Sequence, residues 1–285
     1  MGNIIDQHFL ELLQTMTLRI QLSLKNGNLG NKRSRSTGSS VEFSDYKEYL
    51  PGDDFRRIDW NAYGRFEKVF VKLFMQEQES PVTVFLDISK SMSFEDKKET
   101  GIKIAATFSY VALSDYDTVS LALFNEGVSQ SLINLRGSIS FNRIMNLLET
   151  SLFKGNSKLL ESIQQWEPRL KKGITIVISD LMFDHELEKV IRLLSFKKQR
   201  VIVCHVLSES EINPLFEENM QLIDVETQAT LDIDTGIEAI NLYKHKLEAY
   251  MHDIQTICKK YKTDYVFVNT SVPIEQFIKQ IQLLT

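Results

Sequence analysis

The feature that most constrains the fold is a series of short apolar segments separated by longer amphipathic ones, which begins near residue 81. The apolar segments show no alternation with polar residues, which is typical of strands covered on both faces of a sheet. The segments between them have the length and periodicity of helices. The expected strands are 82–87, 118–124, 174–179, 201–206 and 264–268, and the expected helices are 96–114, 139–150, 158–171, 184–197, 237–261 and 273–284. We therefore expect an α/β fold with a doubly wound, mostly parallel, Rossmann-like sheet over residues 81–285, and a ligand site beyond the carboxyl ends of its strands.

Two parts of the chain depart from this pattern. Residues 4–24 place apolar side chains at steps of three and four, as in an amphipathic helix, and residues 41–50 and 66–78 alternate as strands do. We expect these to form a small N-terminal annex of one helix and a few strands over residues 1–80. Two short strand patterns around a polar turn also predict a hairpin insert at 220–235 within the larger domain.

Composition excludes several classes of protein. The chain has 33 basic and 38 acidic side chains, and this acidic balance argues against general nucleic-acid binding. One basic cluster, Lys32, Arg33 and Arg35, has no aromatic residues among it that would stack on bases. Only two cysteines are present, and no apolar run approaches the roughly 18 residues of a membrane helix. We expect a cytoplasmic protein with no nucleic-acid partner and no membrane insertion.

Oxygen-bearing side chains follow two of the expected strands. Asp87, Ser89 and Ser91 come at alternate positions after the first strand, and Asp180 directly follows 174–179. In a loop that curls around its own interior, alternate residues can point to a common centre. Carboxylate and hydroxyl oxygens are ligands for hard cations such as Mg²⁺, with Mn²⁺ or Ca²⁺ as alternatives. The same residue types also cap helices and form turns, so a purely structural role is the competing interpretation.

This loop resembles the metal-ion-dependent adhesion site of von Willebrand factor A domains, whose signature is Asp-x-Ser-x-Ser followed by a distant Thr and a distant Asp. Ser157, after Gly155, stands where those domains have Thr, and Asp180 stands at the distant Asp. The resemblance implies that Asp87, Ser89, Ser91, Ser157 and Asp180 form a metal site.

Further upstream, the segment YLPGDDFRRIDW at 49–60, followed by Arg65, is similar to the domain of unknown function 58 family of bacteria and archaea. With the later motif, the likeness covers about residues 30–210. It implies a non-enzymatic, magnesium-assisted binding module with a von Willebrand factor A-like fold. Members are often encoded beside MoxR-type AAA+ ATPases and are thought to work with them in maturing or assembling other proteins.

The block from Asp53 to Arg65 carries acidic and basic residues in near balance around Trp60. We interpret it as an ion-pair network that fastens the annex to the sheet domain, with Trp60 as an anchor. The functional alternative is that Arg56 and Arg57 form a docking patch for an acidic partner.

Three functions remain open from the sequence. The leading hypothesis is a protein-binding module in which a partner's carboxylate completes the metal coordination, the partner being a MoxR-type AAA+ ATPase or its client. The alternative is a Mg²⁺-dependent phosphohydrolase with Asp87 as the nucleophile. Such enzymes use a second acid two residues later, where this chain has Ser89. The third is a structural scaffold that holds no metal.

Overall fold

The computed structural model describes residues 4–15, 43–66, 68–74, 81–114, 117–182, 186–214, 221–223, 230–232 and 237–282. The basic cluster at 32–35 and residues 16–24 of the expected first helix lie outside these ranges. The chain divides into two compact units. One is Asn28–Glu79, and the other combines Met1–Gly27 with Ser80–Thr285.

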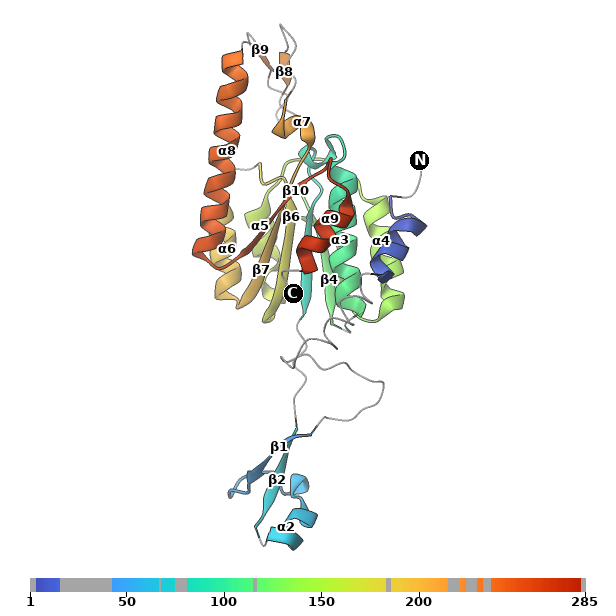
Figure 1. Cartoon of the computed structure of the whole chain (residues 1–285), viewed down its shortest axis with the longest axis vertical. Helices are drawn as coiled ribbons and strands as arrows, with labels where there is room; N and C mark the ends of the chain where they lie inside the picture. The colour runs from blue at the N-terminus through green and yellow to red at the C-terminus, as the bar shows by residue number, and fades with distance from the viewer. Residues whose placement is uncertain are drawn as a thin grey trace. The chain divides into compact units, whose positions relative to one another are not determined.

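A six-stranded sheet lies at the centre of the larger unit, with strand order β10-β7-β6-β3-β4-β5 (Figure 1). Its strands are β3 (Val82–Asp87), β4 (Val119–Phe124), β5 (Val128–Leu135), β6 (Gly173–Ser179), β7 (Gln199–Leu207) and β10 (Asp264–Asn269). Neighbouring strands are parallel except for β5, which runs antiparallel to β4. The predicted mixed α/β fold with a mostly parallel sheet is therefore confirmed. The edge strand β5 was not predicted, because most of its side chains face solvent and it lacks the apolar run of a central strand.

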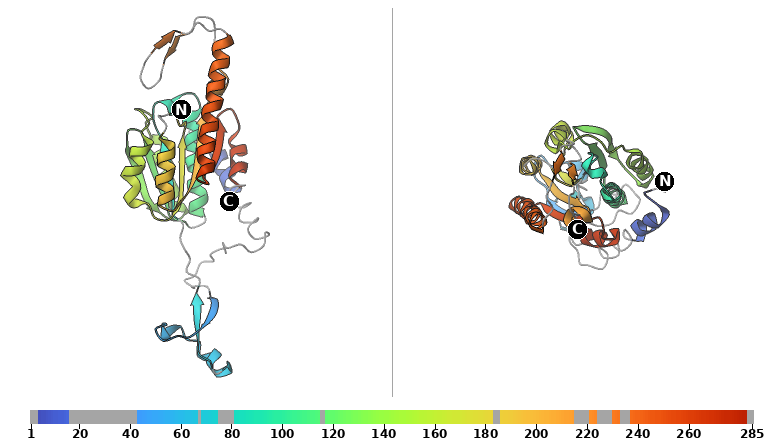
Figure 2. Two further views of the ribbon diagram at one scale, coloured as in Figure 1. Left: turned by 90° about the vertical axis from the view of Figure 1, so that its left-hand side faces the viewer. Right: turned by 90° about the horizontal axis from the view of Figure 1, so that it is seen from above.

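Helices cover both faces of this sheet (Figure 2). The helices of the larger unit are α3 (Lys97–Ser114), α4 (Phe141–Thr150), α5 (Leu159–Trp166), α6 (Leu187–Phe196), α7 (Glu209–Ile212), α8 (Ile237–Lys260) and α9 (Ile274–Gln282), with short 3-10 turns η2 (Ser91–Ser93), η3 (Ser138–Ser140) and η4 (Glu167–Arg169). Of these, α7 lies beyond the edge of the sheet (Figure 1). Along β3, Val84 and Leu86 belong to the core under α3, α4 and α9, whereas Phe85 belongs to the core under α5, α6 and α8. Because alternate strand residues point to opposite faces, a continuous apolar strand serves two cores.

The N-terminal helix, residues 7–15, packs on the larger unit. The Asp6 carboxylate accepts a hydrogen bond from the Phe9 amide at 2.8 Å, which caps the helix start. Ile5, Phe9 and Leu13 are buried in the same core as α3 and β3. The structure thus differs from the annex expected over residues 1–80, because the helix buries its apolar face against the sheet unit. Periodicity predicts such a face but not what covers it.

The smaller unit consists of the antiparallel pair β1 (Phe43–Glu48) and β2 (Phe70–Phe74), a 3-10 turn η1 (Phe55–Arg57) and the helix α2 (Trp60–Phe66). Asp59 connects them: its carboxylate accepts bonds from the Tyr46 hydroxyl at 2.8 Å and from the backbone amides of Asn61 and Ala62. Lys72 on β2 lies 3.1 Å from the same carboxylate. These hydrogen bonds, that of Tyr46 first, lower the pKa of Asp59 to about 2.

The segment between α7 and α8 contains two short strands, β8 (Gln221–Ile223) and β9 (Thr230–Asp232), which pair antiparallel. They lie within the insert expected at 220–235. Among the helices that the structure describes, none has the length and apolar character that crossing a membrane requires.

Candidate functional site

The fold creates a reversal of strand order beside β3. From β3 the chain continues to β4 on one side, and it later returns to place β6 on the other side of β3. The carboxyl ends of the parallel strands β3 and β6 lie at the same edge of the sheet. Asp87 ends β3, Ser179 ends β6, and Asp180 follows directly. This is the position where open α/β sheets bind their ligands.

Asp87 is the centre of a cluster of hydroxyl groups, and its side chain is fully buried. Its Oδ1 accepts a hydrogen bond from the Ser89 amide at 2.8 Å. Its Oδ2 accepts from the hydroxyls of Ser157 at 2.6 Å and Ser179 at 2.7 Å. The hydroxyl oxygens of Ser89 and Ser91 are 3.1 Å apart. The structure therefore brings together Asp87, Ser89, Ser91 and Ser157.

Backbone hydrogen bonds between two loops position Ser157 at this cluster, although Ser157 is 70 residues from Asp87 along the chain. The loop between α4 and α5 runs beside the loop after β3, with the Lys154 amide donating to the Ile88 carbonyl and the Lys90 amide donating to the Gly155 carbonyl, both at 2.8 Å. Gly155 has a φ of 77°, a conformation that favours glycine. The turn at Gly155 thus sets where Ser157 lies.

The carboxylate of Asp87 carries an unfavourable charge. Burial and then repulsion from Asp180 raise the pKa of Asp87 to about 6, against the lowering effect of the bonds from Ser157, Ser89 and Ser179. Within the part of the chain that the structure describes, Asp87 has no ion-pair partner. A buried negative charge without a cation is destabilising, and a bound divalent cation would offset it.

Asp180 lies at the same edge but has different partners. Its Oδ2 accepts a bond from Lys97 Nζ at 2.9 Å, and its Oδ1 accepts from the Met182 amide at 3.3 Å. Lys97 Nζ also donates to Glu211 Oε1 at 2.6 Å. Burial alone lowers the pKa of Lys97, but attraction from Asp180 and Glu211 outweighs it and raises the pKa above its usual value. Lys97 is therefore charged, and its ammonium group neutralises part of the site.

The donor set fits a hard cation. Ser157 donates its hydrogen to Asp87, which leaves the lone pairs of its oxygen available, and one of Ser89 and Ser91 is in the same position. Ser179 also donates to Asp87, but its oxygen accepts from the Leu181 amide at 3.0 Å. Mg²⁺ prefers oxygen ligands and keeps several waters, so a site of hydroxyls around one carboxylate suits it. The described residues contain no group of three or more His, Cys, Asp or Glu side chains that could hold a metal, so a cation here would depend on the serines.

Sequence reasoning did not find Ser179, Lys97 or Glu211. Ser179 ends the apolar run ITIVIS directly before Asp180, and a hydroxyl at a strand end beside a candidate ligand was the available signal. Lys97 is followed by Lys98, and nothing in the pattern distinguishes the buried lysine from its partly exposed neighbour. Glu211 lies 114 residues from Lys97, so only the tertiary fold reveals their contact.

His205 on β7 pairs in register with Ser179 and is fully buried. Its Nδ1 lies 2.9 Å from the Tyr265 hydroxyl. Burial lowers the pKa of His205 to about 4, so the imidazole is neutral at pH 7. Cys204 and Cys258 are also buried, and burial raises the pKa of both thiols, which keeps them unreactive.

Arg56 and Arg57, the candidate docking residues, are both exposed on η1 of the smaller unit. The Arg57 Nε lies 3.9 Å from Asp54 Oδ2, and the Arg56 guanidinium lies 6.0 Å from the centre of the Phe55 ring. Trp60 is 67% exposed and packs edge-on against Tyr63. Docking by the two arginines stays a prediction.

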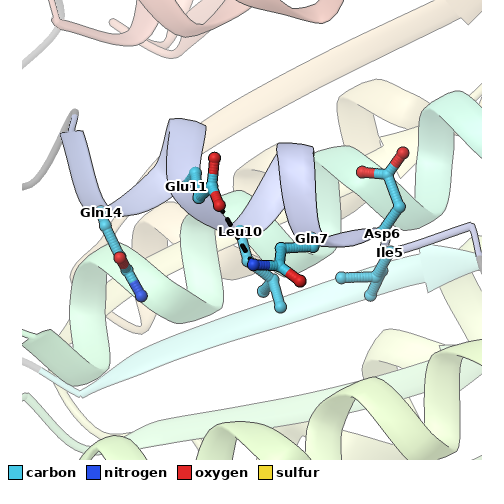
Figure 3. Close-up of a pocket in the computed structure, with 6 residues that line it drawn as sticks. All are labelled: Ile5, Asp6, Gln7, Leu10, Glu11 and Gln14. Atoms are coloured by element: carbon cyan, nitrogen blue, oxygen red, sulfur yellow. Dashed lines mark hydrogen bonds between the residues drawn. The ribbon is translucent and has the colours of Figure 1, made fainter.

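A surface depression of about 650 Å³ lies along the N-terminal helix (Figure 3). Its lining residues are Ile5, Asp6, Gln7, Leu10, Glu11 and Gln14. In the close-up, the Gln7 amide donates to the Glu11 carboxylate, a bond of 3.2 Å along one face of the helix. None of the residues around Asp87 lines this depression.

Several known proteins are similar to this chain. Uncharacterized proteins of Mycobacterium bovis and Mycobacterium tuberculosis are each 20% identical over 247 residues, which cover 83% of this chain and 74% of theirs. Among solved structures, the conserved hypothetical protein BatB from Bacteroides thetaiotaomicron has a TM-score of 0.46 at 17% identity and covers 72% of this chain and 96% of its own. The pilus adhesin SpaC from Lactobacillus rhamnosus GG has a TM-score of 0.44 at 13% identity and covers 73% of this chain and 30% of its own. The family described as "Protein of unknown function DUF58" matches residues 45–250, and the chain belongs to this family.

Proposed function

We propose that this protein is a non-enzymatic, Mg²⁺-dependent protein-binding module of the von Willebrand factor A type. Ser89, Ser91 and Ser157 would hold the ion, with Asp87 and Asp180 reaching it directly or through water. The observation that carries the proposal is the buried Asp87 carboxylate, which accepts hydrogen bonds from three chain segments and has no ion-pair partner among the described residues. Mn²⁺ or Ca²⁺ are the alternative ions.

The ion would supply a positive centre for a carboxylate. An acidic side chain of a partner protein would complete the coordination, so that binding depends on both the metal and the partner's Asp or Glu. The family resemblance suggests a MoxR-type AAA+ ATPase or its client as this partner, in the cytoplasm, with a role in protein maturation or complex assembly. Arg56 and Arg57 are predicted to add a second contact with an acidic partner.

The state of Asp87 favours binding over phosphoryl transfer. A nucleophilic aspartate needs a free oxygen that faces the substrate. Both oxygens of Asp87 accept hydrogen bonds, and the side chain is fully buried. Hydrolysis of p-nitrophenyl phosphate by the full chain, lost in Asp87→Asn, would reverse this preference.

Calorimetric titration of the full chain with MgCl₂ or MnCl₂ tests the site. We expect binding by the wild type, and loss or strong weakening in Asp87→Ala and Ser91→Ala. Ser93→Ala is the matched control, because the Ser93 hydroxyl lies in the same turn but donates to the Lys90 carbonyl at 2.6 Å and is exposed. Equal binding by Ser91→Ala and Ser93→Ala would contradict the proposed ligand set.

Capture of partners by the immobilised full chain, with and without a chelator, tests the role of the ion. We expect the captured proteins to be lost both on chelation and in Asp87→Ala, while Ser93→Ala retains them. Capture that survives both changes would show that the metal is not part of the interface.

A further inference from the structure

Lys97 connects the candidate site to a neighbouring part of the fold. Its Nζ lies 2.9 Å from Asp180 at the site and 2.6 Å from Glu211 on α7. The side chains of Lys97 and Asp180 are each 1% exposed, so water does not screen their attraction. One ammonium group therefore holds two carboxylates from separate segments together.

Glu211 also determines the start of α7. Its Oε2 accepts a bond from the Ser208 amide at 2.8 Å, while the Glu211 amide donates to the Ser208 hydroxyl at 3.3 Å. This reciprocal arrangement is a capping box. One oxygen of Glu211 thus stabilises α7 and the other holds Lys97, so a shift of Lys97 affects the helix directly.

The helix α8 contacts both segments that Lys97 connects, the start of α7 and the loop after β6. The Tyr243 hydroxyl donates to the Glu211 carbonyl at 2.7 Å, and the Tyr250 hydroxyl donates to the carbonyl of Leu181, next to Asp180. Tyr243 and Tyr250 are seven residues apart and share one face of the helix. In Figure 1, α7 and the first half of α8 lie beyond the same edge of the sheet. We call residues 209–212 and 237–250 the α7–α8 arm.

We propose that Lys97 is a positioning residue that couples cation binding at the Asp87 cluster to the α7–α8 arm. The inference rests on the proposed function. A divalent cation beside Asp87 and the Lys97 ammonium compete for the negative charge of Asp180 and repel each other. Binding of the cation therefore weakens the Lys97–Asp180 pair and displaces the ammonium group toward Glu211. Because Glu211 both pairs with Lys97 and caps α7, this displacement disturbs the start of the helix. Thermodynamic reciprocity then requires that a partner which displaces the arm raises the affinity for the cation, by the same factor by which the cation raises the affinity for that partner.

Titration of the full chain with MnCl₂ gives the first test. Lys97→Met removes the competing charge, and we expect it to bind Mn²⁺ at least about tenfold more tightly than the wild type. Lys103→Met is the matched control, because Lys103 lies on the same helix and pairs instead with Glu99, at 2.6 Å. Its affinity for Mn²⁺ should equal that of the wild type.

Hydrogen exchange of the full chain gives the second test. In the wild type, saturating Mn²⁺ should speed exchange in the α7–α8 arm. In Glu211→Gln this response should be lost while Mn²⁺ still binds, because the connection to the arm is broken and the Lys97–Asp180 pair remains. If Lys97→Met does not fold, as circular dichroism would show, Glu211→Gln alone carries the test.

The outcomes separate the two ideas. If the wild type binds Mn²⁺ and Lys97→Met binds it no more tightly, or if the arm does not respond to Mn²⁺, the role of Lys97 is wrong and the metal site stands. If neither the wild type nor Lys97→Met binds Mn²⁺, the proposed function itself is wrong, and this inference with it.

Discussion

The buried carboxylate of Asp87 gives the stability of the larger unit an unusual dependence on pH. Burial raises the pKa of Asp87 from its usual 3.8 to about 6. Between these values the folded chain keeps a proton that the unfolded chain releases. Because the folded state binds more protons there, the contribution of Asp87 to the free energy of unfolding falls as pH rises. The effect is absent below about pH 4 and complete above about pH 6.

The size of the effect follows from the shift. Two pKa units correspond to about 3 kcal/mol, at about 1.4 kcal/mol per unit. Asp87→Asn removes the titrating group and keeps a side chain of the same shape. Loss of the bonds from Ser157 or Ser179 adds an offset, but this offset does not change with pH. The difference between wild type and variant should therefore change by about 3 kcal/mol between pH 4 and pH 7, in favour of the variant at pH 7.

Urea unfolding followed by tryptophan fluorescence measures this difference. The chain has two tryptophans, Trp60 in the smaller unit and Trp166, which is buried in the larger one. A Trp60→Phe background makes Trp166 the only reporter. Asp253→Asn, on the exposed side of α8, controls for the type of substitution. Metal-free buffer is essential, because a cation beside Asp87 would stabilise its charge and remove the effect.

Two results would refute this reasoning. A change of less than about 1 kcal/mol between the two pH values would mean that the charge of Asp87 is not costly in the folded chain. A change of the opposite sign would mean that the hydrogen bonds to Asp87 outweigh its burial. Either result would also weaken the case for a cation at this position.

Further predictions concern the rest of the larger unit. Phe9→Ala should destabilise it by about 3 to 5 kcal/mol in urea unfolding, since Phe9 is buried in its core, and a loss below about 1 kcal/mol would mean that the N-terminal helix is not part of that core. Gly173→Ala should cost about 1 to 3 kcal/mol or more, because its Cβ would lie 2.2 Å from the Pro81 carbonyl oxygen; an unchanged urea midpoint would contradict this packing. The lowered pKa of His205 implies that its contribution to stability decreases as pH falls from about 6.5 to about 4, the reverse of Asp87, and His205→Asn should remove this slope in the same titration.

How much of the fold the sequence predicts depends on where apolar residues concentrate. The central parallel strands were predicted because they are buried on both faces, so that apolar residues follow one another along them without alternation. The strand β5 escaped prediction because it lies at the sheet edge, where polar side chains are tolerated. The N-terminal helix was predicted in part, but its partner was not, since an amphipathic face does not specify the surface that covers it.

The candidate site shows the same division. Asp87, Ser89 and Ser91 were placed together correctly because they occupy one loop, and Ser157 was placed by the resemblance to a known motif. Lys97 could not be identified, because its burial depends on two carboxylates that the sequence separates by 83 and 114 residues. Local sequence patterns predict which polar side chains follow the end of a strand. The partners that neutralise a buried charge come from distant segments, so only the tertiary fold reveals them.

The smaller unit is stabilised in a different way from the sheet. Among its described residues only Val71 is a buried apolar side chain, whereas the Asp59 carboxylate joins β1, β2 and α2 at once. A domain organised around one polar hub tolerates exchange of its apolar residues, but its fold depends on that one side chain. Asp59→Ala would remove that hub, release all three elements together and leave the sheet of the larger unit intact.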